Sequence, residues 1–263
     1  MDELHGPFVR KLDALGPLQT ADKIALAAIE ADAKYVQSGT DLIRDDDRAE
    51  GMIVVLEGFA CRYKRRKNGQ RQIMAYLVPG DVCDLDALDL NRMDHAIGTL
   101  SNCRVARIKP DVVSDLRLRP AVIQALQTAA RVDEATLRVW LVNLGCRSAV
   151  ERLAHLFCEL FVRLRSVGLV QGNSFLLPVI QYDLADTTGM TTVHVNRSLG
   201  ALKRAGLIGR KGKHLTIFDM PRLMSVGEFQ PDYLYARKQV GGRDHSLPNG
   251  TAGLTATDAL IPV

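Results

Sequence analysis

The chain lacks the cysteine spacing that metal and redox sites usually require. Its five cysteines are odd in number and widely separated: Cys61, Cys83, Cys103, Cys146 and Cys158. No Cys-x-x-Cys pair occurs, so neither a zinc site nor an iron–sulfur cluster has its usual ligand spacing. We expect most of these thiols to act as small buried apolar groups.

Membrane, export and enzyme signals are missing as well. No apolar run reaches the length of a membrane span, and residues 1–15 lack the basic-then-apolar order of a signal peptide. No Gly-x-Ser-x-Gly, P-loop, His-Glu-x-x-His or dinucleotide fingerprint occurs. We therefore expect a cytoplasmic protein that is not an enzyme and has no membrane partner. Its 263 residues, 47% of them hydrophobic, suffice for two domains with cores.

The most informative segment present is QYDLADTTGMTTVHVNRSLG, residues 181–200, which predicts two short helices joined by a turn. Gly189 stands where the backbone must turn sharply, which a residue without a Cβ does at low cost. Thr191 suits the N-cap of the second helix. That helix then presents a buried stripe at i, i+4 and i+7, formed by Val195, Leu199 and Leu202.

Charge favours a DNA-binding helix-turn-helix over an ordinary helical hairpin. Residues 147–227 contain 11 Lys/Arg and 5 Asp/Glu, whereas residues 1–146 contain 20 and 21. A basic module beside a near-neutral one indicates phosphate contact confined to one domain. The basic stretch Gly209–Phe218 then predicts a wing.

Short strand patterns between turn signals predict an N-terminal antiparallel β-roll, jelly-roll-like in form. The Asn68-Gly69 pair is the strongest of the hairpin signals. Two helices should precede the roll, at His5–Leu15 and Thr20–Asp32. The expected strands are Tyr35–Gln37, Leu42–Arg44, Met52–Glu57, Phe59–Lys64, Gln72–Leu77, His95–Leu100 and Arg104–Ile108.

A long helix beginning near Pro120 shows apolar residues at alternating spacings of three and four, the pattern of two helices packed along their length. Asp133 is the polar exception. A single amphipathic helix lying on the roll is the alternative. Gly145-Cys146-Arg147 should break the helix, and Ser148 with Glu151 forms a capping box for the next one. The expected dimer interface is Ile123, Leu126, Ala130, Asp133, Leu137, Trp140 and Leu144.

This order of elements resembles the CRP/FNR family of bacterial transcription regulators over about residues 20–225. Three strings carry the resemblance: Tyr76-Leu-Val-Pro-Gly-Asp81, Arg147-Ser-Ala-Val-Glu-Arg-Leu-Ala154, and Asp183-Leu-Ala followed by Gly189-Met-Thr-Thr-Val-His-Val-Asn-Arg197. The resemblance implies an α+β fold and a homodimer on a pseudopalindromic site in double-stranded DNA. It also implies an effector at the roll and, for an activator, RNA polymerase as a partner. The expected domains are 1–118, 119–145, 146–227 and a loosely ordered tail, 228–263.

The effector is not indicated. Family members that bind cyclic AMP carry Gly-Glu where this chain has Asp84-Leu85, and their Arg-Ser or Arg-Thr pair is replaced within residues 93–96. Aspartates at 81, 84, 86 and 89 should repel a phosphate. Residues 1–30 contain no cysteine to hold an iron–sulfur cluster. We therefore expect neither cofactor and no metal site. Effector-free DNA binding stays open, as does sensing by a group formed from Cys83, Asp84, Arg92 and His95.

The resemblance places DNA contacts on the second helix of the motif and on the wing. Arg197 matches the position that takes the O6 and N7 atoms of guanine. Val193 stands where many relatives have a Glu that accepts from cytosine, so that preference should be lost. The expected set is Thr191, Thr192, Val193, His194, Asn196, Arg197, Lys203, Arg204, Arg210, Lys211 and Lys213. The alternative function is a small-molecule or cyclic-nucleotide-binding module with no DNA role.

Overall fold

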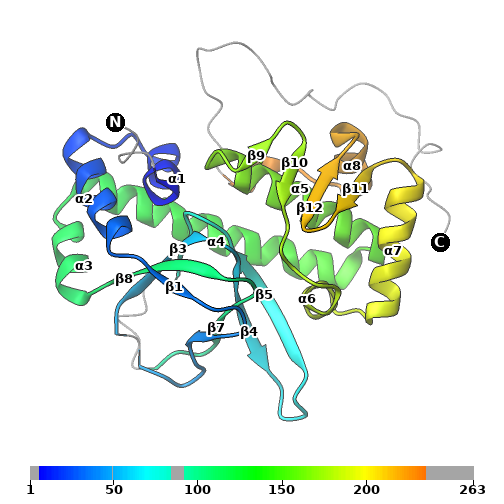
Figure 1. Cartoon of the computed structure of the whole chain (residues 1–263), viewed down its shortest axis with the longest axis horizontal. Helices are drawn as coiled ribbons and strands as arrows, with labels where there is room; N and C mark the ends of the chain where they lie inside the picture. Colours follow the sequence, from blue (N-terminus) through cyan, green and yellow to red (C-terminus); the bar gives the residue numbers. More distant parts are fainter. Residues whose placement is uncertain (1–5, 49, 84–91, 235–263) are drawn as a thin grey trace.

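Two four-stranded antiparallel sheets form the roll, in the orders β1-β8-β3-β6 and β2-β7-β4-β5. The computed structural model describes residues 6–48, 50–83 and 92–234 (Figure 1). The seven expected strands are confirmed, and β6 adds a short strand that pairs with β3. The bounds are β1 Lys34–Val36, β2 Asp41–Ile43, β3 Met52–Glu57, β4 Ala60–Arg65, β5 Arg71–Leu77, β6 Val82–Cys83, β7 Ala96–Thr99 and β8 Cys103–Ile108.

Helices α1 (Pro7–Leu15), α2 (Thr20–Ala31) and α3 (Pro110–Arg117) flank the roll. Glu30 at the end of α2 accepts hydrogen bonds from the first amides of α1, at 2.8 Å from Phe8 N and 3.1 Å from Val9 N. A carboxylate at a helix N-terminus satisfies amides that have no partner within the helix. An apolar core shared with β3 and the long helix then holds α1 and α2 in place.

The long helix α4 (Pro120–Cys146) runs behind the roll and carries the chain to the C-terminal domain (Figure 1). It ends at Cys146, within the predicted break at Gly145-Cys146-Arg147, because Arg147 adopts an extended backbone. Helix α5 (Ala149–Ser166) follows at once. The capping box that opens α5 is confirmed: Ser148 N donates to Glu151 at 2.7 Å, and Ser148 Oγ accepts from Glu151 N at 3.5 Å.

The C-terminal domain contains the expected helix-turn-helix and a small antiparallel sheet in the order β11-β12-β10-β9. The hairpin of β11 and β12 is the wing predicted at Gly209–Phe218, whereas β9 and β10 were not expected from the sequence. The bounds are β9 Val170–Gln171, β10 Ser174–Leu176, α6 Gln181–Thr188, α7 Thr192–Arg204, β11 Ile208–Lys211, β12 His214–Ile217 and α8 Met220–Val226.

The first part of the predicted tail is packed rather than loose, which corrects the expectation for residues 228–234. A short 3-10 helix, η2 (Pro231–Leu234), follows α8, and Phe229 and Leu234 are buried. The Tyr233 hydroxyl donates to Glu159 of α5 at 2.9 Å. Apolar burial and this hydrogen bond hold the segment against α5. Within the described residues, no helix is long and apolar enough to cross a membrane.

Candidate nucleic-acid interface

The turn between α6 and α7 is built as the sequence predicts. Gly189 adopts the left-handed conformation, with φ 64° and ψ 29°, which costs glycine little. Thr191 caps α7, because its hydroxyl accepts from His194 N at 3.3 Å. Thr188 is buried, and its hydroxyl is satisfied by the carbonyl of Leu184 at 2.5 Å. A polar residue therefore fits a position where an apolar one is commoner.

Helix α7 buries one face and exposes the other. Val195, Leu199 and Leu202 pack into the domain core, as expected. Val193 is 64% exposed and lies four residues before Arg197, so the two side chains share a face of the helix. The other exposed residues of the predicted DNA-binding set are Thr191, His194, Asn196, Arg197, Lys203, Arg204, Lys211 and Lys213, whereas Thr192 is half-buried.

One polar contact at this surface was missed by sequence reasoning. Gln181, the first residue of α6, donates through its Nε2 to Oδ1 of Asn196 on α7. The contact orients the Asn196 amide, which was expected to act alone on a base edge. The only sequence signal was a polar residue at the predicted start of the first helix.

The wing divides the predicted basic residues into two groups. The guanidinium of Arg210 donates to the carbonyls of Val179 at 2.9 Å and Gly212 at 3.3 Å, so it holds the wing to the preceding loop. Lys211 and Lys213 flank Gly212 at the tip, and both are exposed. The two lysines are thus available to contact phosphate, whereas the guanidinium of Arg210 is hydrogen-bonded to carbonyls of the protein backbone.

Helix α6 is also bound to the roll, through Arg71 at the start of β5. Arg71 donates to Asp186 and to Asp183, each at 2.6 Å. Asp183 is buried and accepts a further hydrogen bond from Ile180 N at 3.0 Å. Burial acts to lower the pKa of Arg71, but the two carboxylates more than offset it and raise that pKa. Arg71 therefore stays charged and joins the two domains.

Aromatic packing extends this junction. The Tyr76 hydroxyl, on β5, lies 2.6 Å from Thr187 Oγ1 on α6, and the Tyr76 ring meets Trp140 of α4 edge-on at 5.8 Å. Trp140 in turn donates to Glu159 of α5 at 2.9 Å. Side chains of the roll, α4, α5 and α6 thus belong to one apolar cluster. The helix-turn-helix and the roll therefore share one hydrophobic core.

Two buried charges, Asp81 and Arg163, and the half-buried Lys11 reinforce that core. Asp81 accepts from Lys11 at 2.8 Å and from Arg163 at 2.6 Å, so it faces α1 and α5. Burial acts to raise the pKa of Asp81, but the two cations prevail and lower it to about 2. The expectation that Asp81 contributes unbalanced negative charge to an effector site is therefore wrong, because its charge is neutralised within the core.

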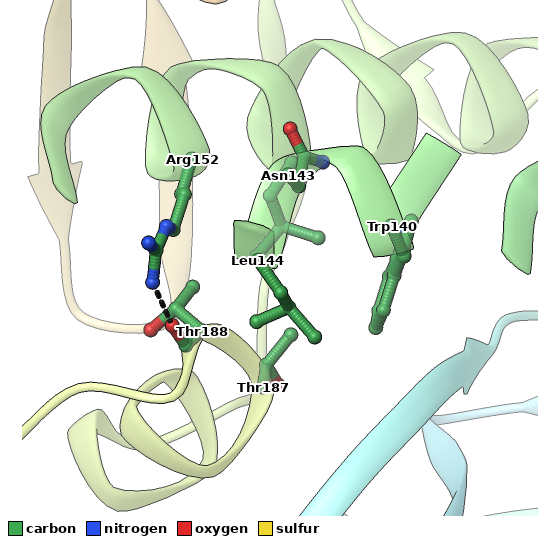
Figure 2. A pocket seen from close by; sticks show the side chains of 7 residues that line it. Trp140, Asn143, Leu144, Arg152, Thr187 and Thr188 are labelled. Carbon is green, nitrogen blue, oxygen red and sulfur yellow. Dashed lines mark hydrogen bonds between the residues drawn. The ribbon is translucent and has the colours of Figure 1, made fainter. Parts of the chain in front are cut away.

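The positions expected to form the dimer interface on α4 point in different directions. Leu126 and Trp140 are buried within their own chain. Asp133 accepts from Arg62 of β4 at 3.0 Å and so joins α4 to the roll. Leu144 extends from α4 toward Thr187 and Thr188 (Figure 2). In this arrangement a partner chain has no access to Leu126 or Trp140. The rest of the predicted set, Ile123, Ala130, Asp133, Leu137 and Leu144, is half-buried or exposed.

The described residues show different neighbours for Cys83, Arg92 and His95, which we named as a possible effector group. Cys83 is buried in β6, opposite Ile53 of β3. Arg92 pairs with Asp46 at 2.9 Å, and His95 lies 2.7 Å from Asp94. Asp84 lies outside the described residues. In the described part of the chain, no three His, Cys, Asp or Glu side chains gather as metal ligands would.

Comparison with known proteins identifies both domains. Residues 151–226 match the model of the Crp-like helix-turn-helix domain, and residues 33–119 match that of the cyclic nucleotide-binding domain. Transcriptional activator protein FnrL of Cereibacter sphaeroides is 28% identical over 77% of this chain and 84% of its own length. Nitrogen fixation regulation protein FixK of Bradyrhizobium diazoefficiens is 28% identical over 73% and 80%.

The fold comparison agrees with these matches. The solved structure of FixK2 from Bradyrhizobium japonicum superposes with a TM-score of 0.64, covering 73% of this chain and 96% of that one at 24% identity. The order of elements, the helix-turn-helix geometry and the curated relatives therefore agree. The chain belongs to the CRP/FNR family and is a DNA-binding transcription regulator.

Proposed function

We propose that this regulator acts as a homodimer whose two α7 helices read the halves of a pseudopalindromic DNA site. The observation that carries this proposal is a stripe of outward-facing residues on α4, with leucines that the described residues leave uncovered. Leu137 is 55% exposed and Leu141 is 73% exposed. Such side chains on a long helix favour packing against another helix. A two-fold protein also matches a two-fold site.

The stripe follows a spacing of three and four along α4. It comprises Ile123, Gln127, Ala130, Glu134, Leu137 and Leu141, all of them half-buried or exposed. It differs from the predicted seam in replacing Leu126, Asp133 and Trp140 by their outward neighbours and in omitting Leu144. Beside the N-terminal half of the stripe lies a cavity of about 250 Å³, bordered by Met52, Leu116 and Ile123. A second α4 laid along the stripe would cover this cavity.

Within each half-site we assign base reading to the face of α7 that carries Val193 and Arg197. A guanidinium forms a bidentate pair with guanine, whereas a valine offers only apolar contact to a thymine methyl. Lys203, Lys211 and Lys213 are exposed cations at the far end of α7 and on the wing tip. We assign these three to phosphates, which fix position and carry no sequence information.

This function has no catalytic step and takes place in the cytoplasm. If the protein activates transcription, RNA polymerase is its expected partner. The signal that would act on the roll is not assigned. We expect an effector to act on the contacts of Arg71 and Tyr76 with α6, because these contacts join the roll to the helix-turn-helix.

Sedimentation of two adjacent variants tests the dimer. Leu141→Asp places a charge in the stripe and should give monomers at micromolar concentration. Val142→Asp is the matched control: Val142 is 48% exposed but lies about 100° further round the helix. That variant should stay dimeric. Dimers of Leu141→Asp would refute the proposed interface.

A further inference from the structure

A strongly basic segment lies outside the helix-turn-helix, within the roll. Residues 58–80 contain six Lys/Arg and no Asp/Glu, although residues 1–146 as a whole are almost neutral. The six are Arg62, Lys64, Arg65, Arg66, Lys67 and Arg71. All of them lie on the hairpin formed by β4 and β5 or on its connecting loop. The net charge of residues 1–146 is nearly zero, but positive charge is concentrated on this hairpin.

The hairpin divides these cations by function. Arg62 lies within β4 and binds Asp133, and Arg71 lies at the start of β5 and binds Asp183 and Asp186. We define the basic tip as Arg65, Arg66 and Lys67, all exposed, for which the described residues provide no carboxylate partner. Their contacts are local and neutral: Arg65 lies 5.4 Å from the centre of the Tyr63 ring, and Arg66 donates to Gln70 at 3.3 Å.

The tip is also held in a defined shape. Gly69 N donates to the carbonyl of Arg66 at 2.9 Å, and Arg66 N donates to the carbonyl of Gln70 at 2.8 Å. Gly69 has a φ of 84°, which a side chain would make costly. The loop therefore presents its cations on a closed turn. Less conformational entropy is lost when a partner binds a turn that is already formed.

The position of the tip relates it to the DNA-reading helix. Arg71, immediately after the loop, binds α6 at Asp183 and Asp186. Gln72 adds a hydrogen bond to the carbonyl of Thr187, two residues before the turn into α7. Figure 1 shows the hairpin extending past the rest of the roll beside α6. Arg65 pairs with Arg71 across the hairpin, so the tip begins at this anchor and continues into the loop of residues 66–70.

We propose that the basic tip binds the phosphate backbone of DNA that flanks the sequence read by α7. The tip has the charge that phosphate attracts, and it carries two guanidinium groups suited to bidentate contact. Arg71 and Gln72, next to the tip, contact α6, so the tip lies beside the helix-turn-helix. Binding by the tip should not depend on the DNA sequence, because phosphates carry no sequence information.

Two variants of equal charge test this proposal in the full-length protein. Arg66→Gln with Lys67→Gln removes two charges from the loop. Lys34→Gln with Lys109→Gln removes two exposed lysines elsewhere on the roll. The probes are two duplexes carrying a site selected by the protein from random sequence: one ends at the edges of the site, and the other extends about one helical turn beyond each edge.

We expect the wild type to bind the extended duplex more tightly than the short one. The loop variant, Arg66→Gln with Lys67→Gln, should lose this preference. Its affinity for the extended duplex should fall about tenfold at low salt, with the salt slope reduced by about 0.9 for each phosphate contact removed. The control variant should keep both properties. Equal losses in the two variants would overturn the proposal, because general electrostatics would then suffice. Unchanged DNA affinity of the loop variant together with weaker binding of RNA polymerase would also overturn it, in favour of an acidic protein surface.

Discussion

Replacing Arg71 with alanine should release α6 from the roll. Arg71 makes two charge-assisted hydrogen bonds of 2.6 Å, to Asp183 and Asp186. A hydrogen bond to a charged group contributes about 1.5–3 kcal/mol when it is buried, as at Asp183. Because the Asp186 side chain is 29% exposed, its share falls toward the value of about 0–1 kcal/mol for surface pairs. The free energy of docking should therefore drop by about 2–4 kcal/mol.

Hydrogen exchange is the suitable assay, because it reports local opening in a protein of more than one domain. A loss of 2–4 kcal/mol corresponds to exchange on the order of a hundredfold faster at tenfold per 1.4 kcal/mol. The effect should be confined to peptides covering residues 71–77 and 181–190. Arg71→Lys should recover part of the protection, since an ammonium keeps the charge but not the planar fork.

Arg65→Ala is the matched control, since it removes the same residue type from the same hairpin. Arg65 has no carboxylate partner in the described part of the chain, so exchange in α6 should stay as in the wild type. Equal protection of α6 in the wild type and in Arg71→Ala would refute the reasoning. The apolar contacts around Tyr76 would then hold the domains together unaided.

The remaining predictions concern pH and the wing. Burial, and then the positive charge of Arg147, lower the pKa of His155 from 6.5 to about 3. The unfolded chain takes up this proton first, so unfolding free energy should fall by about 2 kcal/mol between pH 7.5 and 5 in urea titrations, and by less in His155→Gln. Lys213→Ala should weaken binding to every DNA sequence and flatten the salt slope by about 0.9. Arg210→Ala should instead lower the melting temperature, because its guanidinium holds the carbonyl of Val179.

The elements that could be predicted from sequence are those that depend on local chemistry. The Asn68-Gly69 turn, the Ser148 cap and Gly189 each satisfy a backbone requirement within a few residues, and each is found where it was expected. The reading face of α7 follows from its buried stripe. Base contacts by Val193 and Arg197 stay a prediction, because exposure alone does not identify a base.

The orientation of α4 could not be predicted, because the helix has apolar residues on two adjacent faces. Leu126 and Trp140 belong to the inner face, and Leu137 and Leu141 to the outer one. A spacing of three and four can be traced through either set. Only the tertiary contacts of Trp140 with Tyr76 and Glu159 decide which side is buried. From sequence alone, Asp133 is likewise interpreted as a polar residue in the dimer seam. The structure shows that it pairs with Arg62 of the roll.

The junction between α6 and the roll had no sequence signal. Arg71 and Asp183 are separated by more than a hundred residues, and each alone resembles an ordinary surface charge. A long-range ion pair of this kind depends on how β5 meets α6 in space. The role proposed for the basic tip could not be predicted either, since it depends on the helix-turn-helix lying nearby in space.

We propose that α7 reads DNA through Arg197. The most direct test is to compare the wild type and Arg197→Ala by selecting bound sites from random duplexes and measuring affinity for the selected site. We expect the variant to lose about 1–3 kcal/mol of binding free energy and to lose preference at one base pair in each half-site. Unchanged affinity and an unchanged selected sequence would contradict the account, because another face of the helix would then be the one that meets the bases.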